Sequence, residues 1–521
     1  MKLISVLLLL VVSAVAENDT CFASGSSLKE QEFKSNIRLQ SADIPYVTKH
    51  NHSSSNVVFT LTNQGCFGDW SDNAIFPSGY YPGCEFPKGS LVQHLFQGAL
   101  WIGAVSNDDT LVSCGLDGWQ TVFELYPDSW LNGGIKRLSN RLSDSSYSPE
   151  AIADEELIAV FYDTLTNPDF TRPDPFENRP HTPLGLKIRQ HSYSFGGPPD
   201  DDFILLRYTV TNIGNNYLHG VYAATYFDTD IWHPATRDGF ADDFVGSRWV
   251  PTFDGSDSLL VGYAADNDGD PSSEGVWNQY SARSVFSATV LEPLGSNNNG
   301  FNWWLSNGDA CRDWGPRLKV HDRPFGTDAS GTPEGDRNKY YVMSNPEIDF
   351  NQLWSGTGVI LDDWSGPPSC INNPHMSDIR FLLSFGGGDL APGDSMQFGV
   401  AVVLGENLHV NPTDWSLFDS SNPEAFYNSL DFADLDGNVI EAQRLYQRLF
   451  LGSAGDLDNT GVVDLKDVVA FVNFLFARGT APRYRSAADV NGDCKINLTD
   501  VVLLVRYLYG GGNLVRSGCV E

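Results

Sequence analysis

Apolar and polar side chains alternate in short runs along residues 17–420, with the two-residue period of β-strands. In residues 203–212, Leu206, Tyr208 and Val210 share one face, and polar side chains occupy the other face. This pattern predicts an antiparallel strand that buries one face and exposes the other. Many such runs, separated by Gly, Pro, Asn, Asp and Ser, predict a mainly β body built as a β-sandwich.

Three further segments strengthen the β prediction. Residues 221–228 form the expected returning strand after a turn at 213–216. Residues 395–404 are apolar enough for a central strand and follow a turn at 390–394, and residues 98–104 predict another buried strand. Segments of this kind resemble the immunoglobulin-like or fibronectin-like modules of bacterial extracellular proteins. A body of roughly 400 residues exceeds one sandwich of ~100 residues, which predicts one large, elaborated sandwich or two packed sandwiches.

The apolar period becomes helical after residue 421. Apolar residues recur at helical spacing from Ala425 to Leu449, and Pro423 suits the first turn of a helix. A Gly-Ser-Ala-Gly joint at 452–455 precedes the last segment. The expected organisation is a signal peptide at 1–16, the β-sandwich body at 17–420, a helical connector and linker at 421–452, and a small all-α domain at 453–521.

Two acidic loops, residues 456–467 and 489–500, repeat at an offset of 33 residues, and an apolar helix is expected after each. Oxygen-bearing side chains occupy loop positions one, three, five, nine and twelve. Calcium takes six to eight oxygen ligands, and position seven of such a loop contributes its backbone carbonyl. The spacing therefore predicts two calcium ions. The predicted ligands are Asp456, Asp458, Thr460, Val462 (carbonyl), Asp464 (through water) and Asp467 for the first ion, and Asp489, Asn491, Asp493, Lys495 (carbonyl), Asn497 (through water) and Asp500 for the second.

These tandem loops resemble a type I dockerin domain. No helix directly precedes the second loop, and Asp rather than Glu stands at position twelve, which distinguishes the segment from a pair of EF-hands. The resemblance implies a calcium-dependent domain that binds a cohesin-type module on a scaffold or cell-surface protein. Two positions depart from the usual pattern: Thr460 is a weaker ligand than Asp, and Cys494 replaces the usual Gly at position six.

Dockerins contact their partner through loop positions ten and eleven and through the following helix. The corresponding residues are Leu465, Lys466, Leu498 and Thr499, whereas many dockerins carry a Ser-Thr pair there. The alternative is that the two helices dock within the chain or on a neighbouring domain.

The N-terminus has the pattern of a secretory signal. Lys2 precedes an apolar run from Leu3 to Val12, and the small residues Ala14 and Ala16 flank a cleavage site. No other run of 18 apolar residues occurs, so no transmembrane helix is expected. We therefore expect a secreted, extracellular protein, attached to the cell surface through its partner if that partner lies there.

Charge and cysteines narrow the function classes further. A net charge of −33, from 66 acidic and 33 basic residues, excludes nucleic acid as a partner and suits cation binding. Eight cysteines in an exported chain indicate disulfides. The pairs that would close short loops are Cys66–Cys84 and Cys494–Cys519.

The aspartates between residues 228 and 270 are the best candidate site in the body. We expect a body calcium site formed by Asp228, Asp230, Asp266, Asp268 and Asp270. Two alternatives stay open: solvated turns without an ion, and paired catalytic carboxylates for glycoside cleavage. The tryptophans at 303, 304, 314, 354 and 364 either pack inside the body or stack on carbohydrate.

Familiar catalytic motifs are absent from the sequence, including His-Glu-x-x-His, Gly-x-Ser-x-Gly and the phosphate-binding Gly-Lys-Ser/Thr loop. The leading hypothesis is a secreted, non-catalytic body anchored through its dockerin-like module. The rival hypothesis is an extracellular glycoside hydrolase, because dockerins commonly deliver polysaccharide-degrading enzymes.

Overall fold

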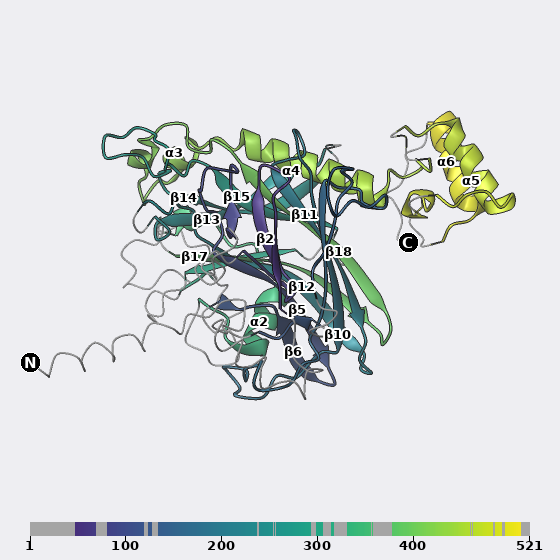
Figure 1. Cartoon of the computed structure of the whole chain (residues 1–521), viewed down its shortest axis with the longest axis horizontal. Coiled ribbons are helices and arrows are strands. Elements are labelled where there is room, and N and C mark those ends of the chain that lie inside the picture. The colour runs from purple at the N-terminus through teal and green to yellow at the C-terminus, as the bar shows by residue number, and fades with distance from the viewer. Residues whose placement is uncertain are drawn as a thin grey trace, which may run out of the picture. The chain divides into compact units, whose positions relative to one another are not determined.

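The chain forms two compact units (Figure 1). The first unit runs to Val439, and the second starts at Ile440 and includes Thr252–Ser256. The computed structural model describes residues 47–68, 81–118, 123–127, 134–236, 239–253, 255, 257–292, 299–305, 314–316, 331–355, 357, 378–458, 460, 462–482, 485–491 and 495–511. The predicted signal peptide lies outside these residues.

Two antiparallel sheets build the first unit, each with nine strands among the described residues. Sheet A has the order β1-β2-β3-β5-β12-β17-β16, with β4 beside β2 and β6 beside β5. Its strands are β1 (Lys49–His52), β2 (Val58–Thr62), β3 (Cys66–Gly68), β4 (Cys84–Glu85), β5 (Gln97–Ser106), β6 (Asp109–Cys114), β12 (Leu218–Thr229), β16 (Gly300–Leu305) and β17 (Ile379–Leu390).

Sheet B has the order β13-β14-β15-β18-β11-β10-β9-β7, with β8 beside β9. Its strands are β7 (Tyr126–Pro127), β8 (Lys136–Leu138), β9 (Glu155–Tyr162), β10 (Leu186–Ser194), β11 (Phe203–Asn212), β13 (Asp243–Pro251), β14 (Ser258–Asp266), β15 (Val285–Glu292) and β18 (Ser395–Gly405). The predicted strands at 203–212 and 395–404 are confirmed, and β18 lies between β11 and β15, as its apolar sequence predicts.

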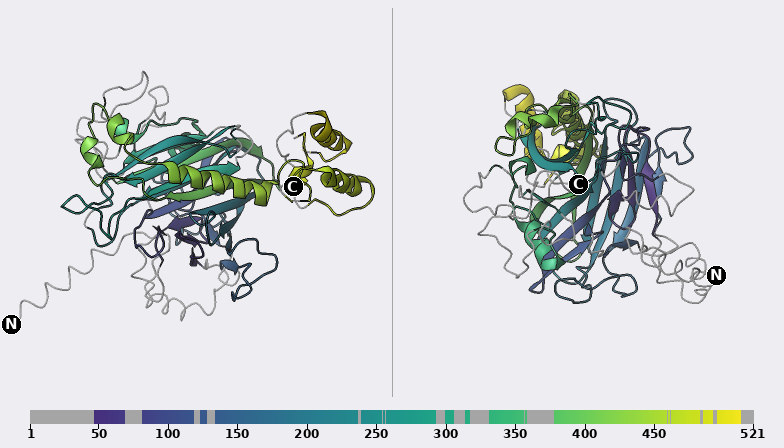
Figure 2. Two further views of the ribbon diagram at one scale, coloured as in Figure 1. Left: turned by 90° about the horizontal axis from the view of Figure 1, so that it is seen from above. Right: turned by 90° about the vertical axis from the view of Figure 1, so that its left-hand side faces the viewer.

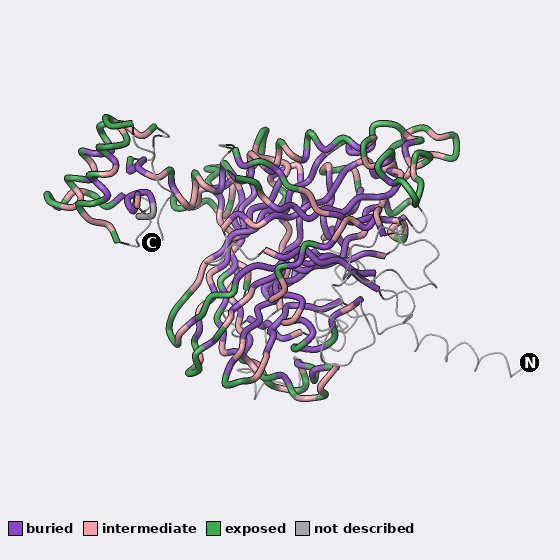
Figure 3. The backbone as a smooth tube through the Cα atoms, turned by 180° about the vertical axis from the view of Figure 1, so that it is seen from behind, coloured by how far each residue is buried: buried purple, intermediate pink, exposed green. Residues whose placement is uncertain are grey.

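The main core lies between the two sheets (Figures 2 and 3). Phe227 on β12 of sheet A packs edge-on against Phe286 on β15 of sheet B, with ring centroids 5.4 Å apart. Phe381 on β17 stacks on Phe227 at 4.9 Å. Because these rings join both sheets in one core, the body is a single large sandwich rather than two packed ones.

The pairing of β12 differs from the prediction. The sequence predicted that residues 221–228 return beside residues 203–212, but β11 lies in sheet B and β12 lies in sheet A. Strand β12 pairs instead with β5 and β17. Most of β12 is buried on both faces, which requires neighbours and cover that a simple two-stranded hairpin does not provide.

A second apolar cluster covers the outer face of sheet A beneath α2 (Gly335–Ser344). Lys339 of this helix forms an ion pair of 2.6 Å with Asp117, and both side chains are 1% exposed. The other short elements of this unit are the 3-10 turns Gln352–Trp354 and Asp414–Leu417 and the helix α3 (Glu424–Tyr427).

The predicted pair Cys66–Cys84 is wrong, because both residues are buried free thiols. Cys66 lies in the cluster on the outer face of sheet A, where its Sγ donates to the carbonyl of Gly115 at 3.2 Å. Cys84 lies in the core between the sheets. Sheet A therefore separates the two cysteines, which had been paired only because they are close in the sequence. Cys494–Cys519 lies outside the described residues.

The tryptophans considered for stacking on carbohydrate lie mostly in the core. Trp303, Trp304 and Trp314 are at most 1% exposed, and Trp303 packs edge-on against Trp314 with centroids 5.4 Å apart. Trp354 is partly buried and contacts Tyr427. Trp364 lies outside the described residues.

The connector contains a helix, α4 (Ala433–Tyr446), that continues into a π turn at Gln447–Leu451. The boundary between the two compact units falls inside α4. Beyond it the second unit contains α5 (Leu465–Phe476), the 3-10 turn Arg485–Ala488 and α6 (Leu498–Gly510). No helix among the described residues is long and apolar enough to cross a membrane.

Candidate metal and docking sites

Each acidic loop of the second unit caps the helix that follows it. The side-chain oxygens of Asp464 and Asn497 accept the backbone N–H two residues ahead, at 2.6 and 2.7 Å. In return, the carboxylates of Asp467 and Asp500 accept the N–H of these capping residues, at 2.7 and 2.9 Å. This reciprocal arrangement is a capping box, and it fixes the direction in which each loop enters its helix.

Asp467 holds the first loop together. Its side chain is fully buried, and its Oδ1 accepts the N–H groups of Leu457 and Asp458 at 2.8 and 3.2 Å. Because its Oδ2 accepts the N–H of Asp464, one carboxylate links the beginning of the predicted calcium loop to its end. This explains why an acidic residue is needed at position twelve before any ion is considered.

Oxygen atoms converge in the first loop. Asp456, Asp458 and Asp467 each place one oxygen within 4.8 Å of the other two. The Thr460 hydroxyl donates to Oδ1 of Asp458 at 2.8 Å and lies 3.4 Å from the Val462 carbonyl. Ligands on opposite sides of a calcium ion are about 4.8 Å apart, so oxygens no farther apart than this can share one ion. The donor set of carboxylates, a hydroxyl and a carbonyl suits calcium in its chemistry.

The second loop repeats this arrangement as far as the structure describes it. Asp489 and Asp500 are fully buried, and Asp500 Oδ1 accepts the N–H of Asn491 at 3.3 Å. The predicted ligand Asp493 and the neighbouring Cys494 lie outside the described residues. Lys495 exposes its side chain, so only its predicted carbonyl role concerns the loop interior.

The helices of the two repeats carry the same two faces. One face is buried in the core of the module and contains Val468 and Phe471 in α5 and their counterparts Val501 and Leu504 in α6. Val463 and Ile496, which occupy position eight of the two loops, both pack against this core. The other face is an exposed apolar stripe, from 38% to 69% exposed, made of Leu465, Val469, Val472 and Phe476 in α5 and Leu498, Val502, Val505 and Tyr509 in α6.

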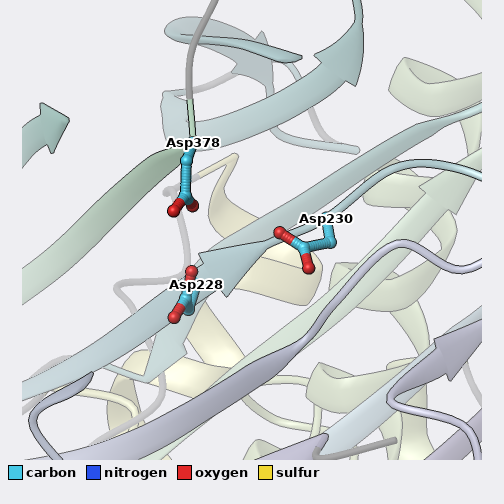
Figure 4. Close-up of side chains that lie close together, drawn as sticks. All are labelled: Asp228, Asp230 and Asp378. Atoms are coloured by element: carbon cyan, nitrogen blue, oxygen red, sulfur yellow. The ribbon is translucent and has the colours of Figure 1, made fainter. Parts of the chain in front are cut away.

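The five aspartates predicted as one body site fall into two groups. Asp228 and Asp230 meet Asp378, and one oxygen of each lies within 4.8 Å of the others (Figure 4). Sequence reasoning missed Asp378, because only the pairing of β12 with β17 brings it near Asp230. In this register Asp228 lies opposite Arg380.

Arg380 supplies a positive charge to this first group. Its Nε lies 3.1 Å from Oδ1 of Asp228, and a terminal nitrogen donates to Oδ2 at 3.2 Å. Its other terminal nitrogen lies 2.6 Å from Asp378. Burial and the nearby Asp378 raise the pKa of Asp228 to about 7 against the opposing influence of Arg380. Burial, Asp228 and Asp378 also hold the pKa of Asp230 well above its usual range.

Asp266, Asp268 and Asp270 form the second group, at the end of β14. One oxygen of each lies within 4.8 Å of the other two. Burial and the carboxylates of Asp268 and Asp270 raise the pKa of Asp242, a neighbour at the start of β13, to about 7. Asp238, which precedes it in the sequence, lies outside the described residues.

Comparison with known protein families supports the interpretation of the C-terminal module. Residues 454–509 match the model of the dockerin type I domain. No curated protein matches the chain.

Solved structures resemble the body only distantly. A polysaccharide lyase is 10% identical, with a TM-score of 0.22 over 71% of this chain and 33% of the lyase. A putative aldose 1-epimerase from Escherichia coli K12 is 9% identical, with a TM-score of 0.22 over 69% of this chain and 99% of the epimerase. A putative kojibiose phosphorylase from the human microbiome is 9% identical, with a TM-score of 0.25 over 80% of this chain and 40% of the phosphorylase. This chain thus spans about a third of the lyase, and TM-scores this low do not relate the body to any of these proteins.

The family match, the duplicated loops and the two capping boxes therefore agree on one module. Residues 454–509 of this chain are a type I dockerin domain.

Proposed function

We propose that this protein is exported and is held by its dockerin module on a cohesin-type partner of a scaffold or cell surface. Two calcium ions order the loops, and the exposed stripes of α5 and α6 supply the contact. The body is a non-catalytic β-sandwich that the module anchors. The observation that carries this proposal is the exposed apolar stripe that both helices repeat.

Exposure of the apolar stripe to water is unfavourable in free energy unless a partner covers it. In each helix it begins with a leucine, Leu465 or Leu498, and ends with an aromatic residue, Phe476 or Tyr509. Large apolar side chains gathered on one face of a soluble module mark interaction surfaces. The polar residues Lys466 and Thr499 follow the two leucines and suit the rim of such an interface.

Calcium binding in both loops follows from the same repeat. Like charges in the first loop, at Asp456, Asp458 and Asp467, oppose one another unless a cation lies between them. A bound ion would also rigidify the start of each helix, where the stripe begins. We assign the two ions to the ligands predicted from the sequence, with Asp464 and Asn497 acting through water.

A non-catalytic body is supported by the state of Asp228. Its side chain is 1% exposed, and both of its oxygens contact Arg380. A glycosidase needs one accessible carboxylate as nucleophile or base and one as acid on either side of the sugar. Asp228 is engaged by an arginine and is inaccessible to a sugar, so this group does not favour the hydrolase alternative.

The test measures binding of the full chain to an immobilised type I cohesin module, with excess calcium and then with chelator. We expect binding that chelation abolishes. The double substitution Leu465→Asp and Leu498→Asp should weaken it at least ~30-fold, because apolar residues at an interface centre contribute roughly 2 kcal/mol or more. Both leucines are more than half exposed, so the fold should tolerate the change.

Leu142→Asp is the matched control, because Leu142 is 82% exposed and lies in the body. It should leave binding unchanged. Failure of the wild-type chain to bind any type I cohesin in calcium would remove the docking proposal. Equal binding with and without chelator would remove the role of the ions.

A further inference from the structure

A second acidic group lies where two neighbouring strands of sheet B meet. Strand β13 begins at Asp243 and β14 ends at Asp266, and the two residues are direct partners in the antiparallel register. The chain then turns through residues 266–270. Asp242 precedes β13 at the same edge, so two segments of the chain bring carboxylates to one place.

Asp266 is the centre of this group. Its side chain is fully buried, and its Oδ1 accepts the N–H groups of Asp268 and Asp270 at 2.9 and 3.2 Å, together with that of Gly269. Its Oδ2 is also buried but has no hydrogen-bond partner among the described residues, and the same holds for Oδ1 of Asp242. A buried carboxylate oxygen without a partner is costly, so a ligand that supplies positive charge is expected there.

Carboxylates dominate the local charge. In the described part of the chain, none of Asp242, Asp266, Asp268 and Asp270 forms an ion pair with a lysine or arginine. Burial, Asp270, Asp242 and Asp268 together raise the pKa of Asp266 well above its usual range. Among the residues that the structure describes, the group thus has no cation comparable to Arg380 in the other group.

We propose that Asp242, Asp266, Asp268 and Asp270 bind a calcium ion that joins the start of β13 to the end of β14. Calcium accepts six to eight oxygens at 2.3–2.6 Å, so opposite ligands are about 4.8 Å apart. The three clustered aspartates each place one oxygen within 4.8 Å of the other two, close enough to share one ion. Several carboxylates around one ion suit calcium rather than magnesium, which usually keeps its waters and takes one or two carboxylates.

Other residues hold the turn in place independently of an ion. The Nε2 of His409 forms a hydrogen bond of 2.8 Å with the carbonyl of Asp266, and Ser281 donates to the carbonyl of Asp270 at 2.9 Å. The ring of Trp277 packs so closely on Gly269 that a Cβ there would approach it to 2.9 Å. Such supporting contacts orient metal ligands before the ion binds.

Trp277 also provides a probe that separates this site from the dockerin. Residues 454–521 contain no tryptophan, so terbium luminescence excited through tryptophan reports only on the body. Terbium is titrated into the full chain as a substitute for calcium, and calcium is then added to displace it. We expect sensitised luminescence that calcium removes and that magnesium does not.

Three variants locate the ion. Asp268→Asn should weaken terbium and calcium binding by on the order of 10- to 100-fold, at least the loss seen when supporting groups of metal sites are removed. Trp277→Phe should reduce the luminescence without changing the calcium concentration needed for displacement. Asp378→Asn, which removes one carboxylate from the arginine-bearing group, is the matched control and should change neither.

Several results would overturn the proposal. One is the absence of tryptophan-sensitised luminescence in the wild-type chain, and another is displacement of terbium by magnesium as effectively as by calcium. The others are unchanged metal binding in Asp268→Asn and loss of metal binding in Asp378→Asn. Circular dichroism of Asp268→Asn checks that the sandwich stays folded. Cohesin binding, measured separately, tests the module and is independent of this outcome.

Discussion

The sandwich contains two groups of clustered aspartates, and they differ in whether a basic side chain of the protein neutralises them. In the first group, Asp228, Asp230 and Asp378 surround Arg380, which contacts two of the three carboxylates. In the second group, Asp266 is equally buried, and the described residues place no lysine or arginine against its unpartnered oxygen. The comparison shows that the number of aspartates does not identify a metal site. What matters is whether the fold already supplies the cation.

The largest effect is expected from removing that cation. Arg380→Met leaves buried carboxylates uncompensated, which should lower the free energy of unfolding by ~3–5 kcal/mol. Urea unfolding measures the change as a lower midpoint at constant slope. Arg444→Met, which removes an exposed pair with Glu441, should cost less than about 0.5 kcal/mol. If Arg380→Met lowered the free energy of unfolding by less than ~1 kcal/mol, the loss would be smaller than that expected for a broken buried ion pair. The carboxylates of the first group would then be neutralised in another way.

A second effect concerns pH. The folded-state pKa of Asp228, raised to about 7, exceeds its unfolded value of ~3.9. The folded state therefore binds the extra proton, and this stabilisation is complete below about pH 4 and is lost as the pH rises through 7. The size is about 1.4 kcal/mol for each pKa unit between the two states. Asp228→Asn should remove this slope, which unfolding free energies measured from pH 4 to 8 would show.

Glu156→Gln provides the opposite control. Burial raises the pKa of Glu156, but hydrogen bonds from His191 and from the N–H groups of Ile152 and Ala153 hold it below its usual value. Its stabilisation is therefore present above the unfolded pKa and is lost as the pH falls. The two substitutions should therefore change the pH slope of the unfolding free energy in opposite directions. A change in the same direction would contradict the assignment of the two pKa shifts.

The smallest effect should distinguish the two groups by its sign. Asp230→Asn removes a half-buried acidic group whose ionisation burial, Asp228 and Asp378 oppose, so the chain should gain up to roughly 1 kcal/mol. Asp268→Asn, measured in calcium, should lose stability because an ion ligand is removed. Thermal unfolding of both variants against Asp169→Asn, an exposed aspartate, provides the comparison. If Asp268→Asn stabilised the chain in calcium, as Asp230→Asn should, Asp268 would not be an ion ligand and the two groups would not differ.

The dockerin module was predictable from the sequence because its chemistry is local. Every predicted ligand of one ion lies within twelve residues, and Asp467 bonds only to residues of its own loop. The β class of the body was also predictable, since the alternation at Leu206, Tyr208 and Val210 follows from burial of one face.

Sequence reasoning failed wherever a distant strand supplies the neighbour. Asp378 and Arg380 come from β17 and reach Asp228 only through the pairing of β12 with β17. The same cause underlies the wrong pairing of residues 221–228 and the wrong disulfide of Cys66 with Cys84. No local pattern encodes which sheet a strand joins, because that choice depends on the packing of the whole core.

The long-range pairing of the sandwich has a consequence for how the protein is made. Strand β11 pairs Phe203 with Val403, and β12 pairs Thr229 with Ile379. The centres of both sheets therefore cannot form until strands that are synthesised much later become available. Chains with such distant contacts fold slowly, because loop closure precedes the favourable contacts. The dockerin module draws its contacts from one short stretch and is complete without them. We therefore expect a molecule with a misfolded body still to present its docking helices, so that binding to the proposed cohesin-type partner would not report whether the body is intact.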